Sequence, residues 1–231
     1  MNTNLNKTKI PSRPEEAKKL FQDAQAVIFD FDGLLVDTEM AIYSSWVRVF
    51  EHHGHELPLD LFNQCLGSGY THWNPANHLE SLTGDTYDWD QINAKRQEEI
   101  VDDLTHAGLL RGALEVLDKC QRRGLPIAVA SSSSHRWVDG WLKKLGIYDR
   151  FICVVCRDDN YPVKPNPDLF LAAAKRIKMK PEQCLVLEDS ENGTKAAHAA
   201  GMKVISIPNR VTEEADFSLS NCITSSLCDL L

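Results

Sequence analysis

The sequence lacks any apolar run approaching the roughly 20 residues that a helix needs to cross a lipid bilayer. Its opening stretch, MNTNLNKTKIPSRPEEAKKL, also lacks the apolar core of a secretory signal. We therefore expect a cytoplasmic protein with no membrane partner. Terminal residues without an anchor are commonly poorly ordered, and we expect residues 1–20 to be loosely ordered.

Positive charge is also scarce. The 231 residues include 25 Lys and Arg against 33 Asp and Glu, which gives a net charge of −8. Binding of nucleic acid needs a basic face, so we expect no nucleic-acid partner. With 43% hydrophobic and 25% charged residues, the chain is typical of globular proteins with a sizeable core. These features leave the oligomeric state open and are compatible with a monomer.

The seven cysteines lack the pattern of a disulfide framework or a zinc site. Their number is odd, and cysteines in a cytoplasmic protein are usually reduced. Cys153 and Cys156 form one CxxC pair inside the apolar run FICVVC, and no second pair completes a zinc site. A redox pair usually opens a helix. We therefore expect both residues to be buried strand cysteines.

What the chain does contain is an alternation of short apolar runs and helix-length segments. The runs that predict strands are AVIFD (26–30), PIAVA (126–130), FICVV (151–155), CLVLE (184–188) and KVISI (203–207). Helices are predicted over 134–145, 168–178 and 191–200. Asn166 is a candidate N-cap for the second helix, and Ser190 and Gly201 are candidate caps for the third. Strands that alternate with helices predict a parallel sheet covered on both faces.

One interval breaks this alternation. Nearly a hundred residues separate the first two predicted strands, and segment 38–108 shows helical periodicity with almost no strand signal. We predict that 38–108 is a helical insertion with its own small core, so that 1–37 and 109–231 form the main domain. Near the C-terminus, ADFSLS (215–220) predicts a last edge strand.

Polar residues follow four of the predicted strands. They are Asp30 and Asp32 after the first, Ser131 and Ser132 after the second, Lys164 beyond the third, and Glu188 and Asp189 after the fourth. Each cluster alone is explained by helix capping or by the helix dipole. Ligands of open parallel α/β sheets, however, bind beyond the carboxyl ends of the strands. Convergence of all four clusters at that edge predicts a functional site.

The chemistry of these clusters is complementary. Several carboxylates in one place repel one another, and a hard divalent cation such as Mg²⁺ relieves the repulsion through oxygen ligands. Lys164 and the serine hydroxyls then remain to bind an anion, helped by free N–H groups at a helix start. A metal site next to an anion site indicates a phosphate ligand.

The segments DFDGLLVDTE, ASSS, KPNPD and LEDS resemble, in this order, the four motifs of the haloacid dehalogenase superfamily. The resemblance spans residues 26–208 and is nearest to the sugar-phosphate phosphatases and β-phosphoglucomutase-like proteins. It implies a Rossmann-like α/β core with an α-helical cap inserted at 38–108. It also implies a Mg²⁺-dependent phosphatase that acts on a small phosphorylated metabolite.

The resemblance also implies roles for individual residues. Asp30 would be the nucleophile that forms an aspartyl-phosphate. Asp32 would first protonate the leaving alcohol and then activate water. The metal ligands would be the carboxylates of Asp30 and Asp189 and the backbone carbonyl of Asp32, with Glu188 bound directly or through water.

The remaining motif residues would hold the phosphate. The resemblance implies that Ser131 and Lys164 contact its oxygens and that the backbone near Ser132 assists. Together with Mg²⁺, Lys164 would supply most of the electrostatic stabilisation of the transferred group.

Two alternatives remain open at this point: a β-phosphoglucomutase-like phosphomutase and a non-catalytic binding protein on the same fold. The sequence departs from the mutase pattern, because Ile42 stands in place of a histidine and LGSGYTHW contains no arginine. The complete set of motifs disfavours a non-catalytic protein. Arg111 stands where many members of the family have a proline. This difference bears on the geometry of the hinge to the cap and not on the chemistry.

Overall fold

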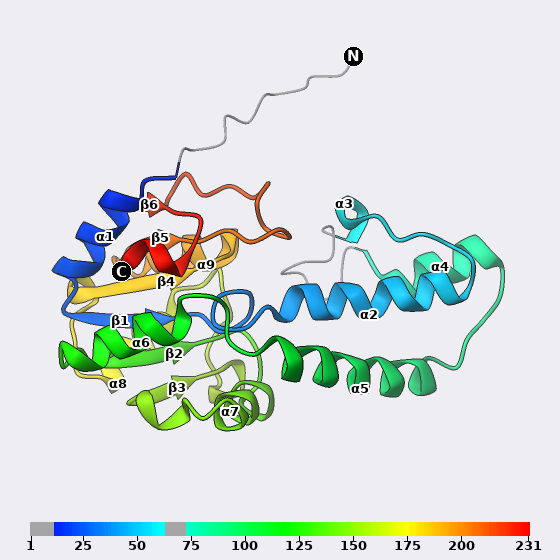
Figure 1. Cartoon of the computed structure of the whole chain (residues 1–231), viewed down its shortest axis with the longest axis horizontal. Helices are drawn as coiled ribbons and strands as arrows, with labels where there is room; N and C mark the ends of the chain where they lie inside the picture. The colour runs from blue at the N-terminus through cyan, green and yellow to red at the C-terminus, as the bar shows by residue number, and fades with distance from the viewer. Residues whose placement is uncertain (1–11, 63–72) are drawn as a thin grey trace, which may run out of the picture.

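The computed structural model describes residues 12–62 and 73–231. Its centre is a parallel sheet with the strand order β3-β2-β1-β4-β5-β6 (Figure 1). The described strands are β1 (Ala26–Phe29), β2 (Ile127–Ala130), β3 (Cys153–Val155), β4 (Cys184–Glu188), β5 (Lys203–Ser206) and β6 (Cys222–Ile223). The predicted α/β class with a parallel sheet is confirmed, and β1 lies between β2 and β4.

Helices cover both faces of this sheet. The described α-helices are α1 (Pro14–Asp23), α2 (Thr38–His52), α3 (Leu59–Phe62), α4 (Pro75–Thr83), α5 (Trp89–Ala107), α6 (Ala113–Arg122), α7 (His135–Lys144), α8 (Asp168–Arg176) and α9 (Glu191–Ala199). Short 3₁₀ turns are η2 (Tyr148–Arg150), η3 (Arg157–Asp159), η4 (Pro181–Gln183) and η5 (Leu227–Leu230).

Alternate side chains of β1 enter two different hydrophobic clusters. Val27 and Phe29 pack with the buried residues of α1, α6 and α7, whereas Ala26 and Ile28 pack with those of α8 and α9. Successive side chains of a strand point to opposite faces, so both faces of this strand are buried. This double burial explains why the strand sequence is a continuous apolar run.

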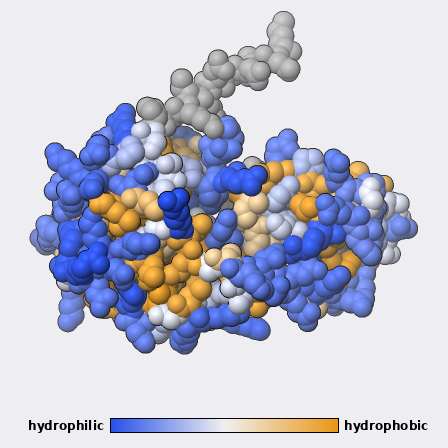
Figure 2. All heavy atoms as spheres, viewed as in Figure 1, coloured by the Kyte–Doolittle hydropathy of each residue, from blue (hydrophilic) through white to orange (hydrophobic). Residues whose placement is uncertain are grey.

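The segment from α2 to α5 has a hydrophobic cluster of its own. Trp46, Phe50, Leu57, Phe62 and Leu79 form its buried part. Figure 1 shows α2 and α5 side by side, extending away from the sheet, with α4 at their far end. On the face seen in Figure 2 hydrophilic side chains predominate, and apolar ones gather on the core near this insertion. Ile100 and Leu104 of α5 instead join the cluster that packs against the sheet. The segment is thus helical with a small core of its own, and its division from the main domain at 38 and 108 stays a prediction.

Two expectations about the ends of the chain were wrong. Residues 14–20, expected to be loosely ordered, belong to α1, where Ala17 and Phe21 are fully buried because an i, i+4 apolar pair faces the sheet layer; residues 1–11 lie outside the described residues. The last strand is β6, not 215–220. The side chains of Asn221 and Ser220 accept hydrogen bonds from the N–H groups of Val204 and Ser206 in β5. Strand pairing with β5 therefore begins only at Cys222.

Smaller differences concern a cap and a cysteine. Pro167, not Asn166, is the N-cap of α8, because the Asn166 side chain donates to the carbonyl of Val163. Cys156 is buried just after β3, but Cys153 is only half-buried at the start of that strand. Within 12–62 and 73–231, no helix is both long and apolar enough to cross a membrane.

Candidate active site

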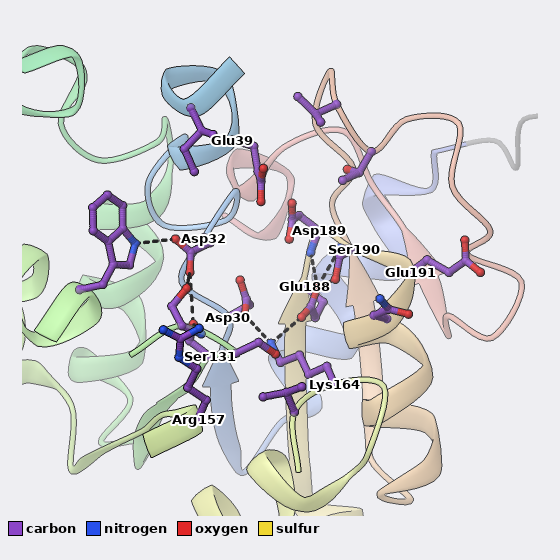
Figure 3. Close-up of a pocket in the computed structure, with 18 of the residues that line it drawn as sticks. Asp30, Asp32, Glu39, Ser131, Arg157, Lys164, Glu188, Asp189, Ser190 and Glu191 are labelled. Atoms are coloured by element: carbon purple, nitrogen blue, oxygen red, sulfur yellow. Dashed lines mark hydrogen bonds and ion pairs between the residues drawn. The ribbon is translucent and has the colours of Figure 1, made fainter. Parts of the chain in front are cut away.

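The carboxyl ends of the central strands open onto a cavity of about 1300 Å³ (Figure 3). All residues predicted for the site line it: Asp30, Asp32, Ser131, Ser132, Lys164, Glu188 and Asp189. The helical insertion supplies further lining residues, among them Glu39 and Ile42 from α2 and Ile100 from α5. The cavity therefore lies between the sheet and the insertion, at the edge where the sequence places the polar clusters.

Lys164 lies between two carboxylates at the base of the cavity. Its Nζ donates to Asp30 Oδ1 and, at 2.7 Å, to Glu188 Oε1. All three residues are at least nine-tenths buried. Burial alone lowers the pKa of a lysine, but here Asp30 and Glu188 outweigh it and raise the pKa of Lys164 above its ordinary value. The ammonium group is consequently a fixed positive charge.

Negative charge exceeds positive charge in this cluster. Asp30, Glu188 and Asp189 are buried carboxylates, and Lys164 is the buried cation beside them. Burial is the main cause that raises the pKa of Asp30 and of Asp189 well above the ordinary value, and neighbouring carboxylates add to it. Lys164 offsets this only in part. The site therefore favours a further cation bound through oxygen atoms.

The donor set fits a cation that needs few protein ligands. Among the described residues, no group of three or more His, Cys, Asp or Glu side chains is arranged as a complete metal cage. Mg²⁺ does not require one, because it is usually held by one or two carboxylates and several waters. Two buried carboxylates, those of Asp30 and Asp189, line the same cavity and meet that requirement.

Glu188 is engaged on both oxygens. Oε2 accepts hydrogen bonds from Asp189 N, Ser190 N and Ser190 Oγ at 2.8–2.9 Å, while Oε1 accepts from Lys164. Gly193 makes room for this arrangement, because an added Cβ would lie 1.7 Å from Glu188 Oε1. In this structure Glu188 thus orients Lys164 and fixes the turn between β4 and α9.

Asp189 is held by Asn209, which the sequence analysis did not identify, and Gly33 leaves room for it. Asn209 Nδ2 donates to Asp189 Oδ2 at 2.7 Å and to the carbonyl of Gly33 at 3.3 Å. Gly33 has φ +77°, and an added Cβ would lie 2.2 Å from Asp189 Oδ2. Asn209 follows β5 in the chain, so the strand-end rule that located the other residues could have located it as well.

Asp32 has different partners from Asp30. Trp137 Nε1 donates to its Oδ1 at 2.8 Å, and the hydroxyls of Ser133 and Ser131 donate to its Oδ2 at 2.7 and 3.2 Å. Figure 3 shows the dashed lines from Asp32 as separate from those that join Lys164 to Asp30 and Glu188. Ser133 and Trp137 were not predicted. Ser133 could have been found from the serine run after β2, whereas Trp137 had no chemical signal in the sequence.

The two serines predicted to bind an anion differ in their contacts. Ser131 is almost fully buried, and besides donating to Asp32 its Oγ accepts from Ser133 N at 3.0 Å. Ser132 is half-buried and lines the cavity. Both lie in the segment that leads from β2 into α7.

Glu39 is a further acidic group that the sequence analysis did not include. It lies in the first turn of α2 and lines the cavity from the side of the insertion. Burial, with smaller contributions from the carboxylates of Asp32 and Asp37, raises the pKa of Glu39 to about 7. Its charge therefore changes near neutral pH.

Comparison with known proteins gives one consistent result. A family model described as haloacid dehalogenase-like hydrolase matches residues 27–207. The "Putative phosphatase YhcW" of Bacillus subtilis is 37% identical over 212 residues, which cover 90% of this chain and 96% of that protein. Fructose-1-phosphate phosphatase YqaB of Escherichia coli is 29% identical, over 81% of this chain and 98% of that protein.

A solved structure shares the fold. The crystal structure titled "putative beta-phosphoglucomutase from Thermotoga maritima" matches with a TM-score of 0.75, covering 90% of this chain and 96% of that one. Its sequence identity is 24%, so this likeness concerns the fold alone.

Proposed function

The chain belongs to the haloacid dehalogenase-like hydrolase family, and from that premise we propose a Mg²⁺-dependent phosphatase that hydrolyses a small phosphorylated metabolite, such as a sugar phosphate. Its class, a phosphoric monoester hydrolase, follows from the family match and from phosphatases among its relatives. The observation that carries the proposal is the buried Lys164 held between Asp30 and Glu188 at the base of the cavity. A cytoplasmic location remains a prediction.

In the first half of the proposed reaction, Asp30 attacks the phosphorus atom. A bond forms between its carboxylate oxygen and phosphorus, and the bond from phosphorus to the ester oxygen breaks. Asp32 gives its proton to the departing oxygen. Lys164, fixed beside Asp30, neutralises charge on the phosphoryl oxygens. Ser131 and Ser132, at the end of β2, complete the phosphate site.

The second half returns Asp30 to its starting state. Water attacks the aspartyl-phosphate and gives its proton to Asp32 as the bond between Asp30 and phosphorus breaks. Inorganic phosphate is the product. The carboxylates of Asp30 and Asp189 and the carbonyl of Asp32 would hold Mg²⁺, which supplies positive charge next to the phosphoryl oxygens. Glu188 would bind the metal directly or through water, and it would also orient Lys164.

The charges of the insertion favour hydrolysis over a mutase reaction. A mutase needs a second phosphate site in its cap, and such sites favour arginine. Arg48 is already paired with Glu99 and Asp103 at 2.8 Å, and Arg96 is 5% exposed with its guanidinium 3.5 Å from the Trp46 ring centre. The segment 63–72, outside the described residues, contains no Lys or Arg.

We propose 38–108 as a cap that encloses a singly phosphorylated substrate.

The test is phosphate release from a panel of phosphate monoesters, with Mg²⁺ and with EDTA. We expect turnover only with the metal, and Asp30→Asn should abolish it because an amide is neither a nucleophile nor a good Mg²⁺ ligand. Asp90→Asn, on the exposed surface of α5, is the matched control. Full activity of the Asp30 variant or in EDTA would disprove the mechanism.

A second assay separates hydrolysis from isomerisation. The protein is incubated with β-glucose 1-phosphate and a trace of glucose 1,6-bisphosphate, and both glucose 6-phosphate and inorganic phosphate are measured. We expect no steady accumulation of glucose 6-phosphate. Accumulation without matching inorganic phosphate would identify a mutase instead.

A further inference from the structure

One short segment of chain holds the Asp32 carboxylate. The donors are Ser131 and Ser133 to Oδ2 and Trp137 to Oδ1, at 3.2, 2.7 and 2.8 Å. All three lie between the end of β2 and the first turn of α7. The direction of Asp32 in the cavity is therefore set by the start of α7.

Trp137 differs from the two serines in what its polar atom can do. A hydroxyl group can turn and either donate or accept, whereas an indole N–H only donates. Hydrogen bonds to a charged acceptor are roughly twice as strong as neutral ones. The bond from Trp137 therefore stabilises Asp32 most when the carboxyl group has lost its proton.

Packing fixes the direction of this N–H group. The Trp137 ring is half-buried against the hydrophobic cluster around α6 and α7. It also meets the ring of Trp141 edge to face, with 5.9 Å between centroids and 71° between planes. The indole is thus packed on the same helix that presents its N–H to Asp32.

We propose that Trp137 is a positioning residue for the second half of the phosphatase reaction, a proposal that rests on the function proposed above. In the first half Asp32 carries a proton, which it gives to the leaving group. In the second half Asp32 is a carboxylate that must accept a proton from water. The indole N–H holds it in that acceptor state, so Trp137 assists hydrolysis of the aspartyl-phosphate more than its formation.

The kinetic test uses p-nitrophenyl phosphate with Trp137→Phe. This substrate has a good leaving group, so formation of the aspartyl-phosphate needs little help from Asp32. The substitution keeps an aromatic ring and removes the N–H. We expect kcat to fall about 10-fold, as for loss of a hydrogen bond to a charged group, while kcat/KM stays near the wild-type value. A burst of p-nitrophenol equal to the enzyme concentration should precede the steady state.

Three further variants separate positioning from folding. Trp89→Phe, at the start of α5, also removes an indole N–H that donates to a carboxylate, that of Glu80, but it does not contact Asp32 or Trp137, and it should leave kcat as in the wild type. Ser133→Ala removes another donor to Asp32 and should lower kcat in the same way, so the test survives if Trp137→Phe does not fold. In an Asp32→Asn background, Trp137→Phe should cause no further loss, because it acts through Asp32.

The outcomes are distinct. Equal losses in kcat and kcat/KM, an unchanged kcat, or a full additional loss in the Asp32→Asn background would overturn the role of Trp137. If instead the wild-type protein releases no phosphate from any monoester, the proposed function itself fails.

Discussion

Replacing Glu39 with glutamine should make the stability of the protein less dependent on pH. Glu39 lies half-buried at the start of α2, and burial, aided by Asp32 and Asp37, raises its pKa from 4.5 to about 7. One pKa unit corresponds to about 1.4 kcal/mol, so this difference corresponds to about 3 kcal/mol of unfolding free energy.

The sign follows from which state holds the proton. Below pH 4.5 Glu39 is protonated in both the folded and the unfolded protein, so it does not lower the free energy of unfolding. As the pH rises from 4.5 to about 7, the unfolded chain releases the proton while the folded protein keeps it, so the free energy of unfolding falls. Above pH 7 the loss is complete. Glu39→Gln, which cannot ionise, should escape this loss.

The assay is urea unfolding of the wild type and Glu39→Gln at pH 5, 6, 7 and 8 in buffer containing EDTA. We expect the variant to gain stability relative to the wild type as the pH rises, up to about 3 kcal/mol at pH 8. Glu51→Gln, exposed near the other end of α2, is the control and should show no such trend. A difference that does not change with pH, or a variant less stable at pH 8, would refute the reasoning.

Three other changes, the first of them with a control variant, have definite expected outcomes. Gly193→Ala should abolish phosphate release and lower the melting temperature, because its Cβ would collide with Glu188; Gly140→Ala, with open space around it, should leave activity intact and stabilise α7 by about 0.5–1 kcal/mol. Lys164→Met should abolish turnover and cost about 3–5 kcal/mol in urea unfolding, because it leaves buried carboxylates unpaired. Asp32→Asn should slow alkyl phosphates about 10²–10⁴-fold more than aryl phosphates in steady-state assays, and equal losses would contradict its role as an acid.

The central strands could be predicted because both of their faces are buried. Runs such as AVIFD and CLVLE admit no polar alternation, and they coincide with β1 and β4 to within one residue. Elements at the margins carry weaker signals. Helix α1 buries only Ala17 and Phe21, and most of its other residues are polar, so its apolar signal is weak. The edge strand β6 has two residues, and its position depends on side chains that occupy the hydrogen-bonding groups of β5.

The residues of the candidate site also divide into those that the sequence could predict and those that it could not. Residues at strand ends could be placed together because all parallel strands end at one edge, and all of them line the cavity. Trp137 and Glu39 could not be found by that rule, since each lies in the first turn of a helix. Their relation to Asp32 depends on how α7 and α2 pack in three dimensions. Their chemical roles remain predictions, as do those of the strand-end residues.

The place of β1 in the middle of the sheet has a consequence for the order in which the chain folds. Its register partners are far away in sequence: Val27 pairs with Ile127 on one side and with Leu185 on the other. Contacts of such long sequence separation form slowly. The insertion, whose buried cluster comes from residues 46–79, joins residues closer in sequence than β1 does, and it can form while synthesis continues. The ribosome therefore makes Asp30 among the first residues of the site, yet Asp30 gains its buried surroundings only after the chain has passed β4.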